Sequence, residues 1–132
     1  MSELRTALLH HIGAPGIGEH YDWLLAVDEP ASEPLLAARC FRRPDEVGSD
    51  ERLAFETLNA HRVMYLDYEG PISGGRGHVR QVAHGRYETR RPRPASTDLF
   101  PREFRVRWSG GVVQVWRVEN ETTLHCLERG AE

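Results

Sequence analysis

Apolar and polar residues alternate with a period of two in several segments of this chain, whereas long stretches of helical periodicity are absent. In HYDWLLAV, residues 20–27, Trp23 and Leu25 fall on one side of an extended chain, and His20 and Asp22 fall on the other. This alternation predicts a β-strand whose Trp23 side faces a hydrophobic core.

The C-terminal part of the chain repeats the pattern. The segments REFRVRW and VVQVWRV alternate in the same way and are separated by an SGG turn, which predicts a β-hairpin over residues 102–118. A second turn at NETT leads into TLHCLE, so we predict a three-stranded meander over residues 102–128. Similar patterns predict further strands near residues 4–11, 34–42 and 77–90.

Two segments do not fit a central strand by this pattern. Residues 45–61, DEVGSDERLAFETLNAH, are the best candidate for a short helix, because Ser49 or Asp50 could cap it and acidic residues fill its first turn. The segment RRPRPASTDLFP, residues 90–101, holds three prolines and is predicted to be an exposed connection. Its arginines form a basic cluster with Arg86.

The many short strands predict a mainly β protein with one domain over residues 1–132. We expect a small, closed or nearly closed antiparallel β-barrel with one or two short helices, because closure removes the sheet edges that invite aggregation. A β-sandwich is the alternative.

Charge and composition narrow the possible partners. The net charge of −3 argues against a protein that coats nucleic acid by bulk electrostatics, so any nucleic-acid contact must be local. All 17 basic residues are arginine, whose planar fork of donors suits phosphate. Because a coding bias explains the missing lysine equally well, the composition leaves phosphate binding open.

The chain carries no obvious targeting segment. No apolar run approaches the about 20 residues of a membrane-spanning helix, and MSELRTALLHH lacks the layout of a signal peptide. We therefore expect a cytoplasmic protein with no membrane partner. Cys40 and Cys126 fall outside the spacings of zinc, redox and haem sites, so we expect buried reduced thiols.

Histidine and aspartate at one strand suggest a metal site. His20 and Asp22 are two residues apart, so they project from the same face of the predicted strand. Either His10 or His11, at the end of the preceding strand, could supply a third ligand. Two imidazoles and a carboxylate suit Mn, Fe or Zn. Such a pair also arises by chance, so an ordinary polar role stays open.

A second group of polar residues follows at positions 61–77, HRVMYLDYEGPISGGRG. His61 and Tyr65 lie together if the chain makes a helical turn there, and both could then donate to a phosphate oxygen. The alternative is that His61 packs in a loop while Tyr65 and Tyr68 close the end of the barrel. The GGRG stretch is either a phosphate cradle or a tight turn.

Taken together, these segments carry a resemblance to a known family. The order HxxxPxxxxHYDWLL, then HRVMYLDYEGPISGGRG, then GRYE resembles the 3′-phosphoesterase domain of bacterial DNA ligase D. It is also similar to the short free-standing proteins of the DNA polymerase ligase N-terminal domain family. The resemblance covers roughly residues 5–90, and YLDYEGPISGGRG is its most specific part.

The resemblance implies a compact β-barrel with a crescent-shaped groove that trims the 3′ ends of nucleic acid in DNA repair. Such enzymes use Mn²⁺ or another divalent transition metal such as Zn²⁺, remove a 3′-terminal ribonucleotide and then remove the remaining 3′-phosphate. Nucleic-acid 3′ ends, DNA or an RNA–DNA primer, and a separate ligase or polymerase are the implied partners. By position, His20 and Asp22 match metal ligands, and His11 matches the first metal histidine, with His10 as the alternative.

The resemblance also assigns the groups that face the phosphate. His61 matches a histidine that contacts the reacting phosphate, and Tyr65 matches a tyrosine beside it, so these two are the catalytic candidates. The candidates for phosphate binding are His61, Arg42 and Arg76.

Two departures from the family weaken the implied activity. Leu24 stands where those enzymes have an arginine aimed at the phosphate, and Asn59 stands where they have an acidic residue. Loss of one charged phosphate ligand from a closed site costs a few kcal/mol of transition-state stabilisation. The sequence therefore leaves three functions open: a phosphoesterase, a weakened relative that binds nucleic-acid ends or phosphate ligands without turnover, or an interaction module whose barrel keeps the motif for folding.

Overall fold

The computed structural model describes residues 3–32, 34–90 and 99–132. Its strands are β1 (Leu4–Ile12), β2 (His20–Leu25), β3 (Leu35–Cys40), β4 (Arg52–His61), β5 (Gly70–Pro71), β6 (His78–Thr89), β7 (Glu103–Trp108), β8 (Val112–Asn120) and β9 (Thr123–Ala131). Two 3₁₀ turns, η1 (Pro44–Glu46) and η2 (Val63–Leu66), interrupt the strand order.

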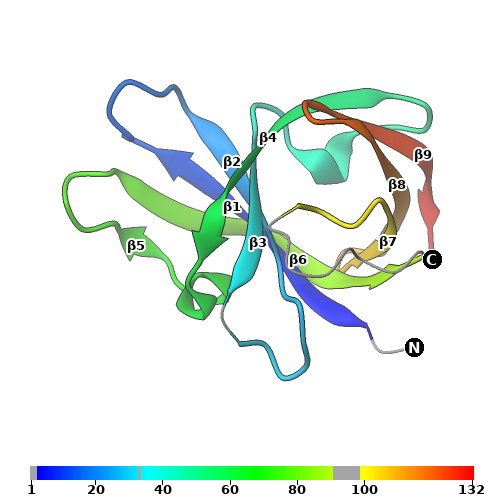
Figure 1. Cartoon of the computed structure of the whole chain (residues 1–132), viewed down its shortest axis with the longest axis horizontal. Helices are drawn as coiled ribbons and strands as arrows, with labels where there is room; N and C mark the ends of the chain where they lie inside the picture. The colour runs from blue at the N-terminus through cyan, green and yellow to red at the C-terminus, as the bar shows by residue number, and fades with distance from the viewer. Residues whose placement is uncertain (1–2, 33, 91–98) are drawn as a thin grey trace.

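The strands form one antiparallel sheet in the order β1-β2-β3-β4-β9-β8-β7-β6, and β6 also pairs with β1. This pairing closes an eight-stranded barrel, which confirms the predicted fold class. Strands β7, β8 and β9 form the predicted meander. The short β5 pairs with the start of β6. The β1–β2 and β5–β6 hairpins extend from the barrel on the side away from the two chain ends (Figure 1).

The predicted helix over residues 45–61 is wrong. Its C-terminal part is strand β4, and the 3₁₀ turn η1 covers only its first two residues, Asp45 and Glu46. Leu53 and Phe55 are buried while Ala54 and Glu56 are exposed, which is the period of a strand. Tertiary pairing decides the outcome, because β4 bonds to β3 on one side and to β9 on the other and so closes the barrel.

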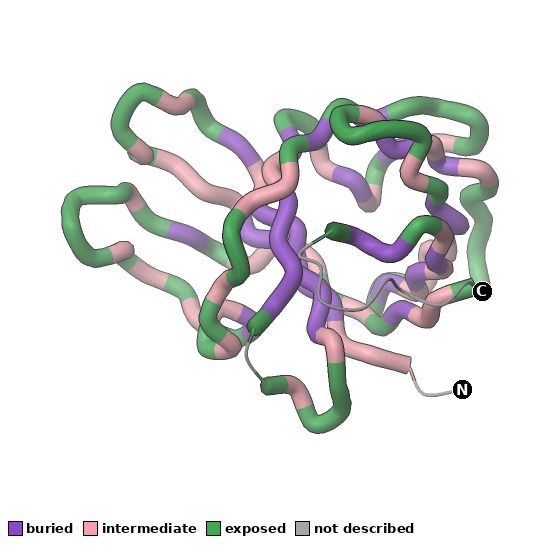
Figure 2. The backbone as a smooth tube through the Cα atoms, viewed as in Figure 1, coloured by how far each residue is buried: buried purple, intermediate pink, exposed green. Residues whose placement is uncertain are grey.

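The barrel interior is filled by aromatic and aliphatic side chains. Figure 2 shows buried residues along the strands that surround this core. Trp23 is fully buried, and its ring contacts those of Trp108 and Trp116. Buried Gln114 joins this core to the loop that holds η1. It accepts from Trp108 Nε1 at 2.8 Å and Trp116 Nε1 at 3.1 Å and donates to the Pro44 and Val47 carbonyls. Every polar atom of this buried amide therefore has a partner.

Strand β2 is buried on both faces, which the alternation pattern does not predict. Trp23 and Leu25 belong to the barrel core, as expected. Leu24, on the other face, is also fully buried, in a second cluster outside the barrel. Leu66 of η2 is buried in the same cluster. The segment after β4 therefore folds back over the outer face of the sheet, the face that carries His20 and Asp22.

Three smaller expectations concern the cysteines, the proline-rich connection and membrane crossing. Cys40 and Cys126 are free and buried, as predicted. Burial raises the pKa of both thiols, that of Cys126 to about 11. Residues 91–98 of the predicted exposed connection lie outside the described residues. Within the described parts of the chain, no helix has the length and apolar character to cross a membrane.

Candidate metal centre and adjoining cleft

Three of the predicted metal ligands meet on the outer face of β1 and β2. His11 on β1 is the direct cross-strand partner of His20 on β2, and Leu9 is the partner of Asp22. Directly opposed residues share a face of the sheet, so both imidazoles and the carboxylate point the same way. One ligand atom from each of the three lies within 4.8 Å of the others.

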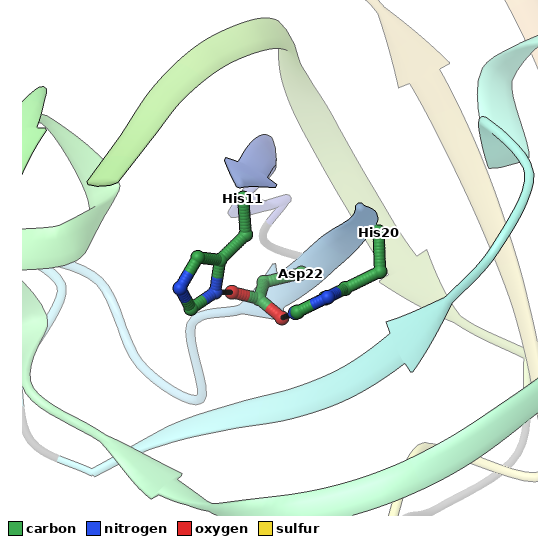
Figure 3. A group of neighbouring side chains, drawn as sticks. All are labelled: His11, His20 and Asp22. Atoms are coloured by element: carbon green, nitrogen blue, oxygen red, sulfur yellow. Dashed lines mark hydrogen bonds and ion pairs between the residues drawn. The ribbon is translucent and has the colours of Figure 1, made fainter. Parts of the chain in front are cut away.

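The Asp22 carboxylate lies between the two rings, with one oxygen toward each (Figure 3). Oδ2 is 2.9 Å from His11 Nδ1, and Oδ1 is 3.2 Å from His20 Nε2. His20 and Asp22 are almost fully buried, and His11 is partly buried. The cluster therefore has little contact with bulk water.

Backbone carbonyls hold both rings from behind. His20 Nδ1 donates to the Gly18 carbonyl at 2.9 Å, and His11 Nε2 donates to the Arg76 carbonyl at 2.8 Å. Because a carbonyl accepts and never donates, these bonds place a proton on His20 Nδ1 and on His11 Nε2. In the neutral rings, the lone pairs of His20 Nε2 and His11 Nδ1 then face carboxylate oxygens. Ligating histidines in metal proteins are held by such carbonyl bonds.

Two buried atoms of the cluster lack a hydrogen bond. His20 Nε2 and Asp22 Oδ1 approach within ion-pair distance, yet neither has a partner with hydrogen-bond geometry among the residues that the structure describes. A buried polar atom without a partner costs about 1–3 kcal/mol. A divalent cation would satisfy both atoms at once, and nitrogen and carboxylate donors suit Mn²⁺ or Zn²⁺. The residues present therefore fit the metal that the resemblance implies.

The pKa values of the cluster reflect this close contact. Burial alone would lower the pKa of His20, but the neighbouring Asp22 and the Gly18 carbonyl together raise it. Burial alone would raise the pKa of Asp22, but His20 and His11 together lower it. The carboxylate is therefore ionised throughout the physiological range and available to a cation.

His10, the alternative to His11, lies on the opposite face of β1. It is the cross-strand partner of Tyr21, and the two rings stack with centroids 5.1 Å apart. Its Nε2 is 3.2 Å from Glu19. The structure therefore brings His11, and not His10, to His20 and Asp22.

A cleft of about 340 Å³ connects this cluster to the predicted phosphate-facing residues. His11 and Asp22 line it together with His61, Tyr65 and Arg76. The rest of the lining is Leu9, Asn59, Ala60, Arg62, Ile72, Ser73 and Val79. The two groups of candidate residues, which are far apart in sequence, therefore face a common space.

His61 and Tyr65 are neighbours because η2 makes a helical turn between them, as their spacing predicts. Their ring centroids are 6.0 Å apart in an edge-to-face arrangement. His61 Nδ1 donates to the Asn59 carbonyl at 2.8 Å, which leaves Nε2 as the nitrogen that can meet a ligand. Tyr65 also contacts the ring of Tyr68, which packs against the outer apolar cluster.

Of the two predicted phosphate-binding arginines, one lines the cleft. Arg76 donates to Ser73 through Nε and Nη2, and no described carboxylate pairs with it. Arg42 is exposed in the turn after β3, 3.8 Å from Glu51, and does not line the cleft.

The GGRG stretch is a turn that brings the Arg76 carbonyl to His11. Gly77 has a φ of +86°, and a Cβ there would lie 2.0 Å from the Ile12 carbonyl oxygen and 2.7 Å from the Gly13 carbonyl carbon. Glycine is therefore required where the β5–β6 hairpin passes close to the β1–β2 hairpin. The turn acts on the cluster through its backbone.

The acidic residues of the same stretch, Asp67 and Glu69, hold η2 and the chain that follows it against the barrel. Asp67 accepts hydrogen bonds from Arg5 on β1, the shorter one 2.7 Å long. Glu69 accepts from the backbone N–H of Gln81, whose side chain donates to the Leu66 carbonyl. These bonds fasten η2 and the following chain to β1 and β6, so Asp67 and Glu69 are structural.

One residue beside the cluster was not a candidate from sequence. Arg39 on β3 is the cross-strand partner of Asp22, and it also opposes Glu56 on β4. Its positive charge acts to lower the pKa of His20, against the effect of Asp22. The alternation in LLAARC places Arg39 opposite to the core face, but its nearness to Asp22 depends on the pairing of β2 with β3.

Comparison with known proteins adds no family to these observations. No known family model matches the chain, and the curated proteins searched contain no match to it.

Proposed function

We propose that the protein is a metal-dependent phosphoesterase that processes 3′ ends of nucleic acid, as the resemblance implies. The supporting observation is that two imidazole nitrogens converge on one buried carboxylate, at the edge of a cleft that also holds His61. His11, His20 and Asp22 would hold Mn²⁺ or another divalent transition metal such as Zn²⁺. Such an ion, when bound, polarises a phosphate oxygen and lowers the pKa of water.

Three further residues that line the cleft, His61, Tyr65 and Arg76, would bind and orient the phosphate. His61 is held by the Asn59 carbonyl through Nδ1, so a protonated Nε2 can donate to a phosphate oxygen and stabilise the negative charge that develops there. The Tyr65 hydroxyl provides a second donor and Arg76 a third, charged one. Leu9 and Val79 contribute apolar lining, which reduces competition from water.

The proposed reaction on a 3′-phosphate end is hydrolysis. Water attacks phosphorus, the bond from phosphorus to the 3′ oxygen breaks, that oxygen takes up a proton, and inorganic phosphate leaves. The product is a 3′-hydroxyl, which a ligase or polymerase requires, so a separate enzyme of that kind is the proposed partner. Following the resemblance, we place this activity in DNA repair. The cytoplasm is the proposed location, as expected from the sequence.

A second candidate function is binding without turnover. Leu24 is fully buried beneath η2, so it supplies no donor where the related enzymes have an arginine, and Asn59 replaces an acidic residue at the cleft. A chain with these two replacements could still bind the metal and contact the phosphate, but hydrolyse the 3′-phosphate slowly or not at all.

The decisive experiment uses a DNA primer that ends in a 3′-phosphate or in a single 3′-ribonucleotide, incubated with the protein and Mn²⁺. Conversion to a 3′-hydroxyl end, dependent on the metal, supports the enzyme. Complete inertness at high protein concentration, with retained binding of the primer end, overturns the enzyme in favour of the binding function. Absence of both turnover and binding overturns both.

A further inference from the structure

Arg39 is a charged residue on the face of the sheet that carries the metal ligands. Ala38 and Cys40, its neighbours along β3, are buried in the barrel core, so Arg39 points to the outer face. Its cross-strand partner there is Asp22. Directly opposed residues have Cβ atoms about 5 Å apart. The Arg39 side chain therefore leaves the sheet next to Asp22, and its guanidinium reaches Glu56 on the following strand.

The hydrogen bonding of Arg39 is incomplete. Nη1 donates to Glu56 Oε1 at 3.1 Å, whereas Nε is buried and has no partner in the described part of the chain. Beyond the bond to Glu56, the guanidinium donates to no other described residue. The side chain is 21% exposed, so solvent reaches part of it. Buried donors are nearly always paired in folded proteins, which makes the open donors of a charged group an indication of a missing acceptor.

Asp22 does not supply that acceptor. Its oxygens are directed to His11 and His20, and no hydrogen bond joins it to Arg39. An anion next to the cluster would supply the missing acceptor. A phosphate bound to a cation at the cluster would present oxygens to the guanidinium, whose planar fork binds two of them at once.

We infer that Arg39 is a phosphate-binding residue of this site, a role that rests on the proposed function for its substrate. Arg39 would then supply, from the neighbouring strand β3, a charged donor on the face of the sheet where Leu24 of β2 is buried and supplies none. The competing structural role is that Arg39 neutralises Asp22 and Glu56, in which case its removal would change metal binding or folding and leave phosphate affinity unaffected.

The test measures the affinity of inorganic phosphate for Mn²⁺-loaded protein by calorimetry, and the affinity of Mn²⁺ itself by electron paramagnetic resonance. Arg39→Ala should weaken phosphate binding about ten- to hundredfold, the usual effect of losing a charged hydrogen bond, and change Mn²⁺ affinity less than about twofold. Arg39→Lys, which keeps the charge and loses the fork, should give an intermediate loss. Glu56→Gln should tighten phosphate binding, because it removes the carboxylate that competes for the guanidinium.

Arg105→Ala is the matched control, because Arg105 also opposes a glutamate, Glu88, across a strand pair but is paired with no residue of the His11–His20–Asp22 cluster. It should leave both affinities unchanged. The inference is overturned if Arg39→Ala leaves phosphate affinity unchanged, if it weakens Mn²⁺ as much as phosphate, or if the parent protein binds no phosphate.

These outcomes are separate from the proposed function, because phosphate binding requires no turnover. A parent protein that binds phosphate through Arg39 but hydrolyses no primer would overturn the enzyme and support this inference. If the parent protein binds no Mn²⁺, the proposed metal site is overturned. The same phosphate titration on metal-free protein then decides the role of Arg39 by the same criteria.

Discussion

His11 and His20 oppose each other directly across the β1–β2 ladder, and their ring centroids lie 4.6 Å apart. Because side chains alternate between the faces of a strand, a shift of one residue in this register would replace His11 with His10. The register between β1 and β2 therefore determines which histidine joins His20 and Asp22.

Substitution of His20 should abolish metal binding. His20→Ala removes one of three ligands and should lower Mn²⁺ affinity by at least about a hundredfold, measured by electron paramagnetic resonance on the folded variant. Because His20 is buried, circular dichroism should first establish that the variant is folded, and Asp22→Asn provides a second variant that keeps the side-chain volume.

His10→Ala is the control for this prediction, since His10 lies on the opposite face of β1. It should bind Mn²⁺ as the parent does. Equal Mn²⁺ affinity in the parent and in His20→Ala would contradict the assignment of the ligands.

Metal affinity should fall as the pH is lowered. The pKa of His20 is raised, so its Nε2 becomes protonated at a higher pH than in a free histidine and then competes with the metal. The pKa of Asp22 is lowered, so the carboxylate stays ionised over the same range. For each group that must lose a proton before the metal binds, the Mn²⁺ affinity should fall about tenfold per pH unit below the pKa of that group. Titration of Mn²⁺ between about pH 5 and pH 8 measures this. A flat profile would show that no histidine titrates with binding.

Gly77→Ala should disturb the metal cluster from outside it. A Cβ at this position meets the backbone of Ile12 and Gly13, so the turn must move and withdraw the Arg76 carbonyl from His11. We expect Mn²⁺ affinity to fall by about tenfold, as for the loss of other contacts that orient a ligand.

Gly75→Ala is the matched control for Gly77→Ala. Gly75 also has a positive φ, of +68°, but an added Cβ there meets no atom within 4 Å. It should lower the free energy of unfolding by about 1 kcal/mol through backbone strain and leave Mn²⁺ affinity unchanged. Similar losses of affinity in both variants would contradict the proposed positioning role.

His61→Ala should separate phosphate chemistry from metal binding. If the protein turns over a 3′-phosphate primer, this variant should lower kcat by about a hundredfold, because it removes a donor to the developing charge, and leave Mn²⁺ affinity within about twofold. Tyr65→Phe should give a smaller loss. His84→Ala, a change at an exposed histidine outside the cleft, should have no effect on either quantity.

Gln114→Leu should destabilise the fold without involving the cleft. The change leaves two indole N–H groups and two carbonyls without their buried partner. Since each unsatisfied buried group costs about 1–3 kcal/mol, we expect a loss of about 3 kcal/mol or more in the free energy of unfolding. Urea denaturation measures the loss, and an unchanged midpoint would contradict the role of Gln114 as a buried hub.

Local rules predict much of the fold and fail at β4. The alternation around Trp23 and in the C-terminal meander comes from the two-residue repeat of a strand, so it is visible without any partner. A plausible cap at Ser49 or Asp50 and the acidic residues after it favour a helix over residues 45–61. Buried Leu53 and Phe55 nevertheless alternate with exposed residues, as in a strand. The strand forms there because β3 and β9 provide its hydrogen bonds, and that information is not local.

For the site, the sequence by itself determined that His20 and Asp22 share a face, because residues two apart in a strand always do. It also determined that His61 and Tyr65 are neighbours once the chain turns between them. The tertiary structure decided the choice of His11, the cleft that joins His61 to the metal cluster, and the place of Arg39 beside Asp22. Each of these depends on the register between strands and on the packing of η2 over a buried apolar face. Contacts between residues far apart in the sequence establish both features.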